Sequence, residues 1–143
     1  MAQRVQWKGA HCHLQDAYLM PTLISGGFIY PMSVVTLLSQ VAATERTFQR
    51  EDGDWVGKCL ICGGPLRFDA RTGEGATIEH ILPRNLGGGN DLRNLGVAHR
   101  RCNGEKGRRW DPPARRRRNQ ERYTELVERL RTERARRWRD IAP

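Results

Sequence analysis

Two pairs of metal-binding residue types constrain the fold of this chain more than any other feature of its sequence. The first pair is Cys59-x2-Cys62, and the second, about forty residues later, is His99-x2-Cys102. Each pair lets two side chains bind one ion from a tight turn, and thiolate and imidazole ligands suit Zn²⁺. Gly63-Gly64 after the first pair fits such a turn. The alternative is a set of free thiols and a surface histidine, but two matched pairs favour a closed, structural zinc site.

A zinc site would also compensate for a small hydrophobic core. The chain has 143 residues, of which 38% are hydrophobic, and a core of that size benefits from a metal or disulfide staple. No convincing signal peptide is present, and the apolar stretch Thr22–Leu38 is interrupted by Gly26-Gly27 and Pro31. We therefore expect a soluble, cytoplasmic protein without a transmembrane helix, in which cysteines bind metal more often than each other.

The net charge of +9 is concentrated in the last third of the chain. Residues 1–99 hold nine basic and nine acidic residues, whereas residues 100–143 hold 16 basic and 7 acidic residues. Such an excess predicts a polyanionic partner, with nucleic acid favoured over an anionic membrane surface. The run Arg115–Arg118 suits electrostatic contact with a nucleic-acid backbone.

The expected fold is a small α+β domain with helices at both ends. The expected elements are a helix over 33–50, short strands over 66–69, 76–82 and 94–98, a helix over 101–109 and a helix over 119–139. The apolar stripe of the last helix is expected to pack on the 33–50 helix. The proposed organisation is an irregular segment over 1–31, an N-terminal helix over 32–54, a zinc-containing domain over 55–110, and a basic linker with a C-terminal helix over 111–143.

A second constellation lies between the two zinc pairs and just after them. It consists of Glu79-His80 before Pro83, the run Gly87-Gly88-Gly89-Asn90, the pair Asn94-Leu95, and the ending Cys102-Asn103-x-x-Lys106-Gly107. This order of elements resembles the HNH endonuclease family in its zinc-containing branch, with Asn at the last motif position. The resemblance covers about residues 55–109 and implies a ββα-metal (His-Me finger) core stapled by zinc.

The resemblance also implies roles for individual residues. His80 would be the general base, Asn94 would support it, and Glu79 and Asn103 would bind a catalytic Mg²⁺ or Mn²⁺. Elementary chemistry agrees, because a neutral imidazole can accept a proton from water and oxygen ligands suit hard divalent cations. The family more often has Asp at the position of Glu79 and His at the position of Asn103. The candidate DNA contacts are Lys106, Arg108, Arg109, Arg115, Arg116, Arg117 and Arg118.

These expectations combine into a metal-dependent DNA endonuclease with structural zinc. Stand-alone proteins of this kind resemble phage- or bacterium-encoded nucleases with packaging, restriction or mobility roles, acting in a bacterial cell. A homodimer or phage packaging proteins are open as partners, and no membrane association is expected. The main alternative is a zinc-ribbon module that binds nucleic acid without cutting it. A weaker alternative is an anionic-membrane binder that uses the C-terminal amphipathic helix.

Overall fold

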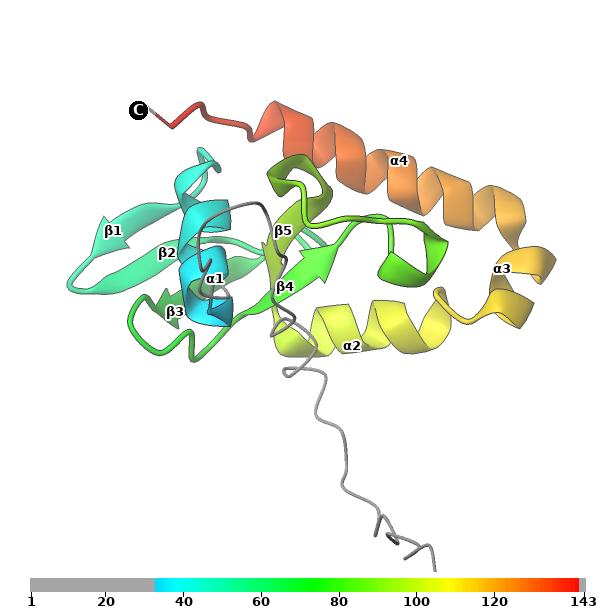
Figure 1. Ribbon diagram of the computed structural model, residues 1–143, viewed down its shortest axis with the longest axis horizontal. Helices are drawn as coiled ribbons and strands as arrows, with labels where there is room; N and C mark the ends of the chain where they lie inside the picture. The colour runs from blue at the N-terminus through cyan, green and yellow to red at the C-terminus, as the bar shows by residue number, and fades with distance from the viewer. Residues whose placement is uncertain (1–32, 142–143) are drawn as a thin grey trace, which may run out of the picture. The chain divides into compact units, whose positions relative to one another are not determined.

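The computed structural model describes residues 33–141, which include all the proposed site residues. The segment 1–31, expected to be irregular, lies outside the described residues. The elements, in chain order (Figure 1), are α1 (Val34–Ala43), β1 (Gln49–Glu51), β2 (Asp54–Lys58), β3 (Pro65–Asp69), β4 (Thr77–His80), η2 (Arg84–Leu86), η3 (Leu92–Asn94), β5 (Leu95–Ala98), α2 (Arg100–Arg109), α3 (Pro113–Arg118) and α4 (Gln120–Arg136). Within the described residues, no helix is long and apolar enough to cross a membrane.

Helix α1 is shorter than its sequence pattern suggests. Its buried residues Leu37, Leu38 and Val41 follow the helical spacing. The expected continuation to Arg50 is wrong, because the helix ends at Ala43 and the chain enters β1 after a turn. Thr44 follows the last residue of the helix, and its hydroxyl donates a hydrogen bond of 2.8 Å to the Val41 carbonyl.

Strands β1, β2 and β3 form an antiparallel sheet that leads into the first cysteine pair. Asp52 (φ 47°) and Gly53 (φ 91°) form the tight β1–β2 turn, since left-handed backbone suits Gly and Asp. In β3, the side chains of Leu66 and Phe68 are buried and alternate with exposed side chains, as expected for a strand with one buried face. Phe68 meets Phe48 edge to face, with ring centroids 6.0 Å apart. This sheet buries one apolar face and delivers Cys59 just after β2.

Strands β4 and β5 with helix α2 form the ββα unit predicted from the sequence. The two strands pair antiparallel, with Glu79 opposite Gly96 and His80 opposite Leu95. All four residues of β5 are buried, and α2 packs against β4. Gly96 leaves room for the Leu60 side chain, which a Cβ at this position would clash with. The predicted fold class, a small α+β domain with a ββα-metal core, is confirmed.

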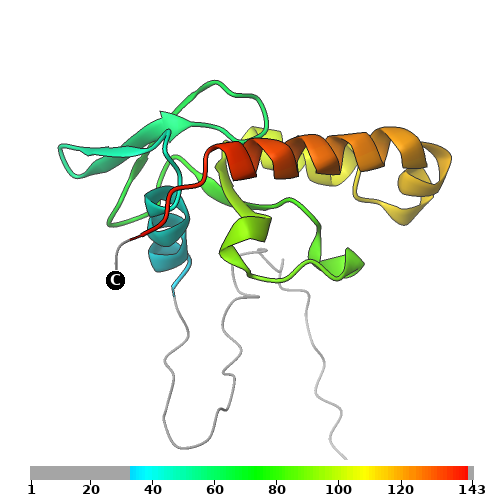
Figure 2. The ribbon, with the colours of Figure 1, turned by 90° about the horizontal axis from the view of Figure 1, so that it is seen from above.

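The basic segment after α2 is more ordered than a linker. Residues Pro113–Arg118 form helix α3, and proline at the first position of a helix loses no hydrogen bond. Helix α4 then runs alongside the domain (Figure 2). Its residues Tyr123, Val127 and Leu130 join one buried cluster with Leu60 and Ile81. The stripe therefore packs mainly on the zinc-bearing domain, and not on the N-terminal helix as expected.

Two arginines near the end of α4 are structural. Arg134 is 1% exposed and donates to the Leu95 carbonyl at 2.7 Å, the Leu92 carbonyl at 3.0 Å and the Thr44 hydroxyl at 2.5 Å. Arg137 lies 3.0 Å from the buried Glu45 carboxylate. These contacts tie α4 to the end of α1 and to the start of β5. Part of the basic charge of residues 100–143 therefore holds the fold together.

Candidate active site and metal centre

The four predicted zinc ligands come together. The ligand atoms of Cys59, Cys62, His99 and Cys102 all lie within 4.8 Å of one another. A tetrahedral site with Zn–S bonds of about 2.3 Å places its ligand atoms about 3.8 Å apart. This donor set, three sulfurs and one imidazole, fits that requirement. The four residues can hold a metal ion such as zinc.

The His99 ring is oriented for metal binding through Nδ1. This nitrogen lies 3.5 Å from Cys62 Sγ and 3.6 Å from Cys102 Sγ. The other ring nitrogen, Nε2, lies 2.9 Å from the Pro65 carbonyl oxygen, to which it donates. That hydrogen bond fixes the tautomer and leaves the Nδ1 lone pair for the metal.

Backbone amides also point at the sulfurs. Gly64 N–H donates to Cys62 Sγ at 3.4 Å, and His99 N–H donates to Cys59 Sγ at 3.5 Å. The Gly64 amide lowers the pKa of the Cys62 thiol to about 7. Burial raises the pKa of the Cys102 thiol to about 11, so a bound cation is what would keep this sulfur as a thiolate. Gly63, with φ 71°, makes the turn that places these amides.

His80 ends strand β4, and its ring contacts a residue not expected from the sequence. Its Nε2 lies 3.0 Å from Asn90 Oδ1. An amide oxygen only accepts, so Nε2 carries the hydrogen and Nδ1 keeps its lone pair. Burial lowers the pKa of His80, so the ring is neutral at physiological pH. The signal in the sequence was the position of Asn90 directly after the glycine run 87–89.

Asn94 supports the loop that carries His80 and Asn90. Its Oδ1 accepts from the Leu82 N–H at 2.9 Å, and its Nδ2 donates to the carbonyls of Leu82 at 3.1 Å and Gly89 at 2.9 Å. These bonds join the segment after His80 to the segment before Asn90. The support from Asn94 therefore runs through the backbone, while Asn90 makes the contact with the ring.

Glu79 is a buried carboxylate with an unsatisfied oxygen. It is 1% exposed, and Lys106 Nζ lies 2.8 Å from Oε1 as an ion pair. This contact lacks hydrogen-bond geometry, and within residues 33–141 Oε2 also accepts no hydrogen bond. Burial raises the pKa of Glu79 to about 7 even though Lys106 opposes the shift. Such an orphaned carboxylate oxygen suits the coordination of a divalent cation.

Asn103 lies on α2 beside the same strand. Its Nδ2 donates to the Ile78 carbonyl at 2.8 Å, which leaves Oδ1 as the atom for a metal. A carboxylate and an amide oxygen are a donor set that fits Mg²⁺ or Mn²⁺. Glu79 is thus a residue of β4, and the Asn103 side chain is held by a hydrogen bond to Ile78, the residue before Glu79 in that strand.

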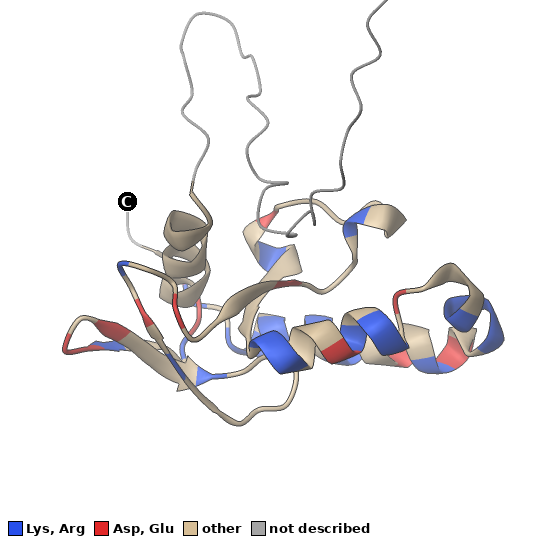
Figure 3. Ribbon diagram, turned by 90° about the horizontal axis from the view of Figure 1, so that it is seen from below, with Lys and Arg blue, Asp and Glu red and all other residues tan. Residues whose placement is uncertain are grey.

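The candidate DNA-contact residues separate by burial into three groups. Lys106 is 4% exposed, and its ammonium also meets the His80 carbonyl at 3.2 Å and the Asp111 carboxylate at 3.4 Å. Its burial differs from the surface phosphate contact expected for it. Five others are exposed on α2 and α3: Arg108, Arg109, Arg115, Arg117 and Arg118. Arg116 is half-buried and donates to the Asp111 carbonyl at 2.7 Å. Figure 3 shows Lys and Arg along these helices and acidic residues at the β1–β2 turn.

A ββα unit with His80 at its strand end, next to a Cys3His metal centre, defines a ββα-metal domain. Residues 59–119 match the family model described as HNH endonuclease, so this part of the chain is similar to that family. Comparisons with curated proteins and with solved structures found no match. The family resemblance inferred from the motif order is confirmed, and it points to a metal-dependent nuclease.

Proposed function

We propose that this protein is a DNA endonuclease in which His80 activates water and Glu79 and Asn103 hold one catalytic divalent cation. The observation that carries the proposal is the pairing of His80 Nε2 with Asn90 Oδ1 at 3.0 Å. It holds a neutral imidazole by its Nε2–H, one residue from a buried carboxylate with an orphaned oxygen.

The proton chemistry follows from that pairing. Asn90 holds the Nε2–H, so His80 Nδ1 accepts the proton of the attacking water. The positive charge that develops on the ring is stabilised by the Asn90 oxygen. Asn94 keeps the two sides of the loop together, so the distance between His80 and Asn90 is set before substrate binds.

Glu79 and Asn103 are the proposed ligands of Mg²⁺ or Mn²⁺. When bound, the cation would neutralise charge on the scissile phosphate and stabilise the leaving 3′-oxygen. The Lys106 ammonium compensates the Glu79 charge and is itself held by Asp111 at 3.4 Å. The four-residue Cys3His site has no open position for substrate, so its proposed role is structural. We place the protein in the bacterial cytoplasm, encoded by a bacterium or a phage, with a role in packaging, restriction or mobility.

One observation favours a second candidate, a zinc module that binds nucleic acid without cutting. Lys106 already neutralises Glu79 at 2.8 Å, so a catalytic cation is not needed to balance that carboxylate. The module would bind DNA through the same exposed arginines. It would show no dependence on added Mg²⁺.

The two candidates are separated by nicking of supercoiled plasmid. Zinc-loaded protein is incubated with plasmid in the presence and absence of Mg²⁺ or Mn²⁺, and plasmid binding is measured in parallel. The nuclease produces open-circular plasmid only with the added cation. Binding without nicking in either cation would favour the non-catalytic module and contradict the nuclease.

A further inference from the structure

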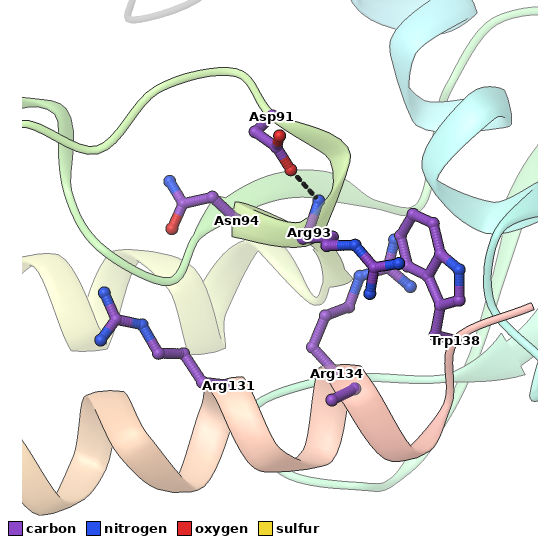
Figure 4. A pocket seen from close by; sticks show the side chains of 7 residues that line it. Asp91, Arg93, Asn94, Arg131, Arg134 and Trp138 are labelled. Carbon is purple, nitrogen blue, oxygen red and sulfur yellow. Dashed lines mark hydrogen bonds between the residues drawn. The ribbon is translucent and has the colours of Figure 1, made fainter.

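A pocket lies between η3 and the last turns of α4, and of its lining residues only Asn94 and the structural Arg134 have been given a role above. Its volume is about 310 Å³, and its lining consists of Asp91, Arg93, Asn94, Arg131, Arg134, Ala135 and Trp138. Three of these seven residues are arginines and one is acidic. A cavity of this size has room for a phosphate group and its adjoining sugar. Figure 4 shows Arg131 reaching from α4 toward Asn94, and Arg93 extending toward Trp138.

The arginines of this pocket carry positive charge that is only partly compensated. Within residues 33–141 the Arg93 guanidinium has no carboxylate partner, and it stacks over Trp138 at 4.2 Å from the ring centroid. Arg134 approaches the same ring at 4.9 Å. Burial lowers the pKa of Arg134, and although Glu45 raises it, the charge of Arg93 lowers it further. Like charges therefore crowd around one indole.

The remaining charged groups leave the pocket open to an anion. Arg131 pairs with Glu128 at 2.8 Å, but both side chains are about half exposed or more, so that pair is weak. The Asp91 carboxylate accepts the Arg93 backbone N–H at 2.7 Å and is occupied in forming the turn. Stacking on Trp138 orients the Arg93 guanidinium plane, and within the described part of the chain its N–H groups donate to no side chain or carbonyl, so they can donate to an anion.

The pocket also adjoins the proposed active site through the chain. Asn94 lines the pocket and bonds to Leu82 and Gly89, while Asn90, four residues earlier, contacts His80. A ligand in the pocket would lie beside the segment that positions the proposed base. A nucleic-acid backbone that reaches His80 can therefore place another of its phosphates here.

We propose that Arg93, Arg131 and Trp138 form a phosphate subsite that holds the nucleic-acid backbone at a position other than the scissile phosphate. The inference rests on the proposed function, since the backbone must also reach His80. The shared ligand chemistry is a phosphate group, which a nucleic acid or a free phosphate ion could supply. Guanidinium groups recognise such oxyanions through paired N–H donors without reading base sequence.

The first test measures the affinity for a short DNA duplex as salt is varied. Arg93→Gln/Arg131→Gln is compared with Arg122→Gln/Arg129→Gln, which removes two exposed charges of α4 outside the pocket. Both pairs are made in a His80→Ala background to prevent cutting. The pocket variant should bind several-fold more weakly and lower the slope of log affinity against log salt by about 1. An equal loss in the control pair, or no loss in the pocket pair, would overturn the subsite.

The second test reads the pocket directly through Trp138 fluorescence. The duplex should change the fluorescence of the parent protein, and the Trp138→Phe variant should lose that part of the change. Inorganic phosphate is titrated separately. If inorganic phosphate gives the Trp138 signal at a lower concentration than duplex phosphate does, the pocket is a free-anion site and the inference fails. The inference also fails if the Trp138→Phe variant keeps the full fluorescence change on duplex binding.

The outcomes separate the subsite from the nuclease proposal. Plasmid nicking by the protein without substitutions tests the nuclease proposal, whereas the binding and fluorescence measurements test the subsite. Pocket-dependent binding without nicking would reject the nuclease and keep the subsite. Nicking with pocket-independent binding would reject the subsite and keep the nuclease.

Discussion

Asn90 is the residue whose proposed role is new relative to the sequence pattern. Its Oδ1 accepts from His80 Nε2 at 3.0 Å, so Asn90→Ala should remove the acceptor that favours the Nε2–H tautomer. Nicking should fall by about 10²-fold, within the range that positioned general bases contribute. The measurement is single-turnover nicking, with Asn85→Ala in the same loop as a control. An Asn90→Ala variant as active as its control would contradict the role.

The Asn90→Asp variant should shift the pH dependence of activity, which a purely structural role of Asn90 would not do. A carboxylate next to the ring stabilises the imidazolium, so the pKa of His80 should rise. The base would then be protonated at a higher pH, and the acidic limb of the activity profile should move upward by about one unit. An unshifted limb would show that Asn90 does not act through His80.

The pH profile of the unaltered protein follows from His80 as well. Burial lowers the pKa of His80 below its ordinary value of 6.5, and the base works only when neutral. Activity should therefore persist as pH falls through 6.5 and be lost at the lower folded-state pKa. A bound cation nearby would shift the pKa of His80 in the same direction and would also lower the pKa of Glu79 from about 7, so His80 would set the acidic limb. Single-turnover rates between acidic and neutral pH give the midpoint, and a midpoint above 6.5 would contradict the assignment.

For single residues, the sequence pointed to candidate site residues more readily than to the contacts that those residues make. Glu79, His80 and Asn103 stood out because their types and order are informative. Asn90 and the burial of Lys106 did not, because both depend on where the loop and α2 fold relative to β4. Two residues that look alike in the sequence, Lys106 and Arg108, end up buried and exposed, since helical periodicity alone does not say which neighbour covers a side chain.

Among the elements, the turn after β2 and the start of α2, which carry the metal ligands, should govern stability. Cys59 is fully buried, and Cys59→Ser would remove one sulfur from the Cys3His set. Structural zinc contributes about 10–16 kcal/mol in zinc-finger peptides, so this variant should lose zinc and unfold. Metal content and circular dichroism are measured, with Cys12→Ser as the control. Full zinc loading and a native spectrum for Cys59→Ser would contradict the structural role.

Helix α4 offers a second test, because its end is fixed by arginines. Arg134→Ala would leave the Leu92 and Leu95 carbonyls and the Thr44 hydroxyl without this donor. The free energy of unfolding should fall by about 3 kcal/mol, the scale of breaking a buried charge's contacts. Arg136→Ala is the matched control, since the Arg136 side chain is 68% exposed and, among residues 33–141, its ion pair is with Glu133 of the same helix at 2.7 Å. Equal urea midpoints for the two variants would contradict the difference between them.

The helices and strands also show which elements the sequence patterns predict and which they do not. Strands β4 and β5 and helices α2 and α4 were placed within a few residues, because each has a clear period or motif. Helix α1 was overextended, since its apolar spacing continues into Phe48, which packs on Phe68 from a different element. Helix α3 was taken for a linker, because four consecutive arginines have no apolar face to indicate a helix.

For the whole described unit, residues 34–141, the structure changes how the excess of basic residues is interpreted. The sequence placed the entire excess of +9 in residues 100–143 and suggested a substrate-holding surface. The structure divides those residues by burial. Lys106, Arg134 and Arg137 are buried and stabilise the fold, while exposed arginines on α2, α3 and α4 face solvent. Total charge thus predicted the class of partner, and only the fold separates residues available to bind from residues that support the domain.

His80 is the proposed base of a metal-dependent nuclease. The most direct test of this role is the nicking rate of supercoiled plasmid in Mg²⁺ for the unaltered protein and for zinc-loaded His80→Ala. The variant should keep its zinc and its circular dichroism spectrum while nicking falls by about 10²–10⁴-fold. Equal nicking by the two folded proteins would contradict the claim.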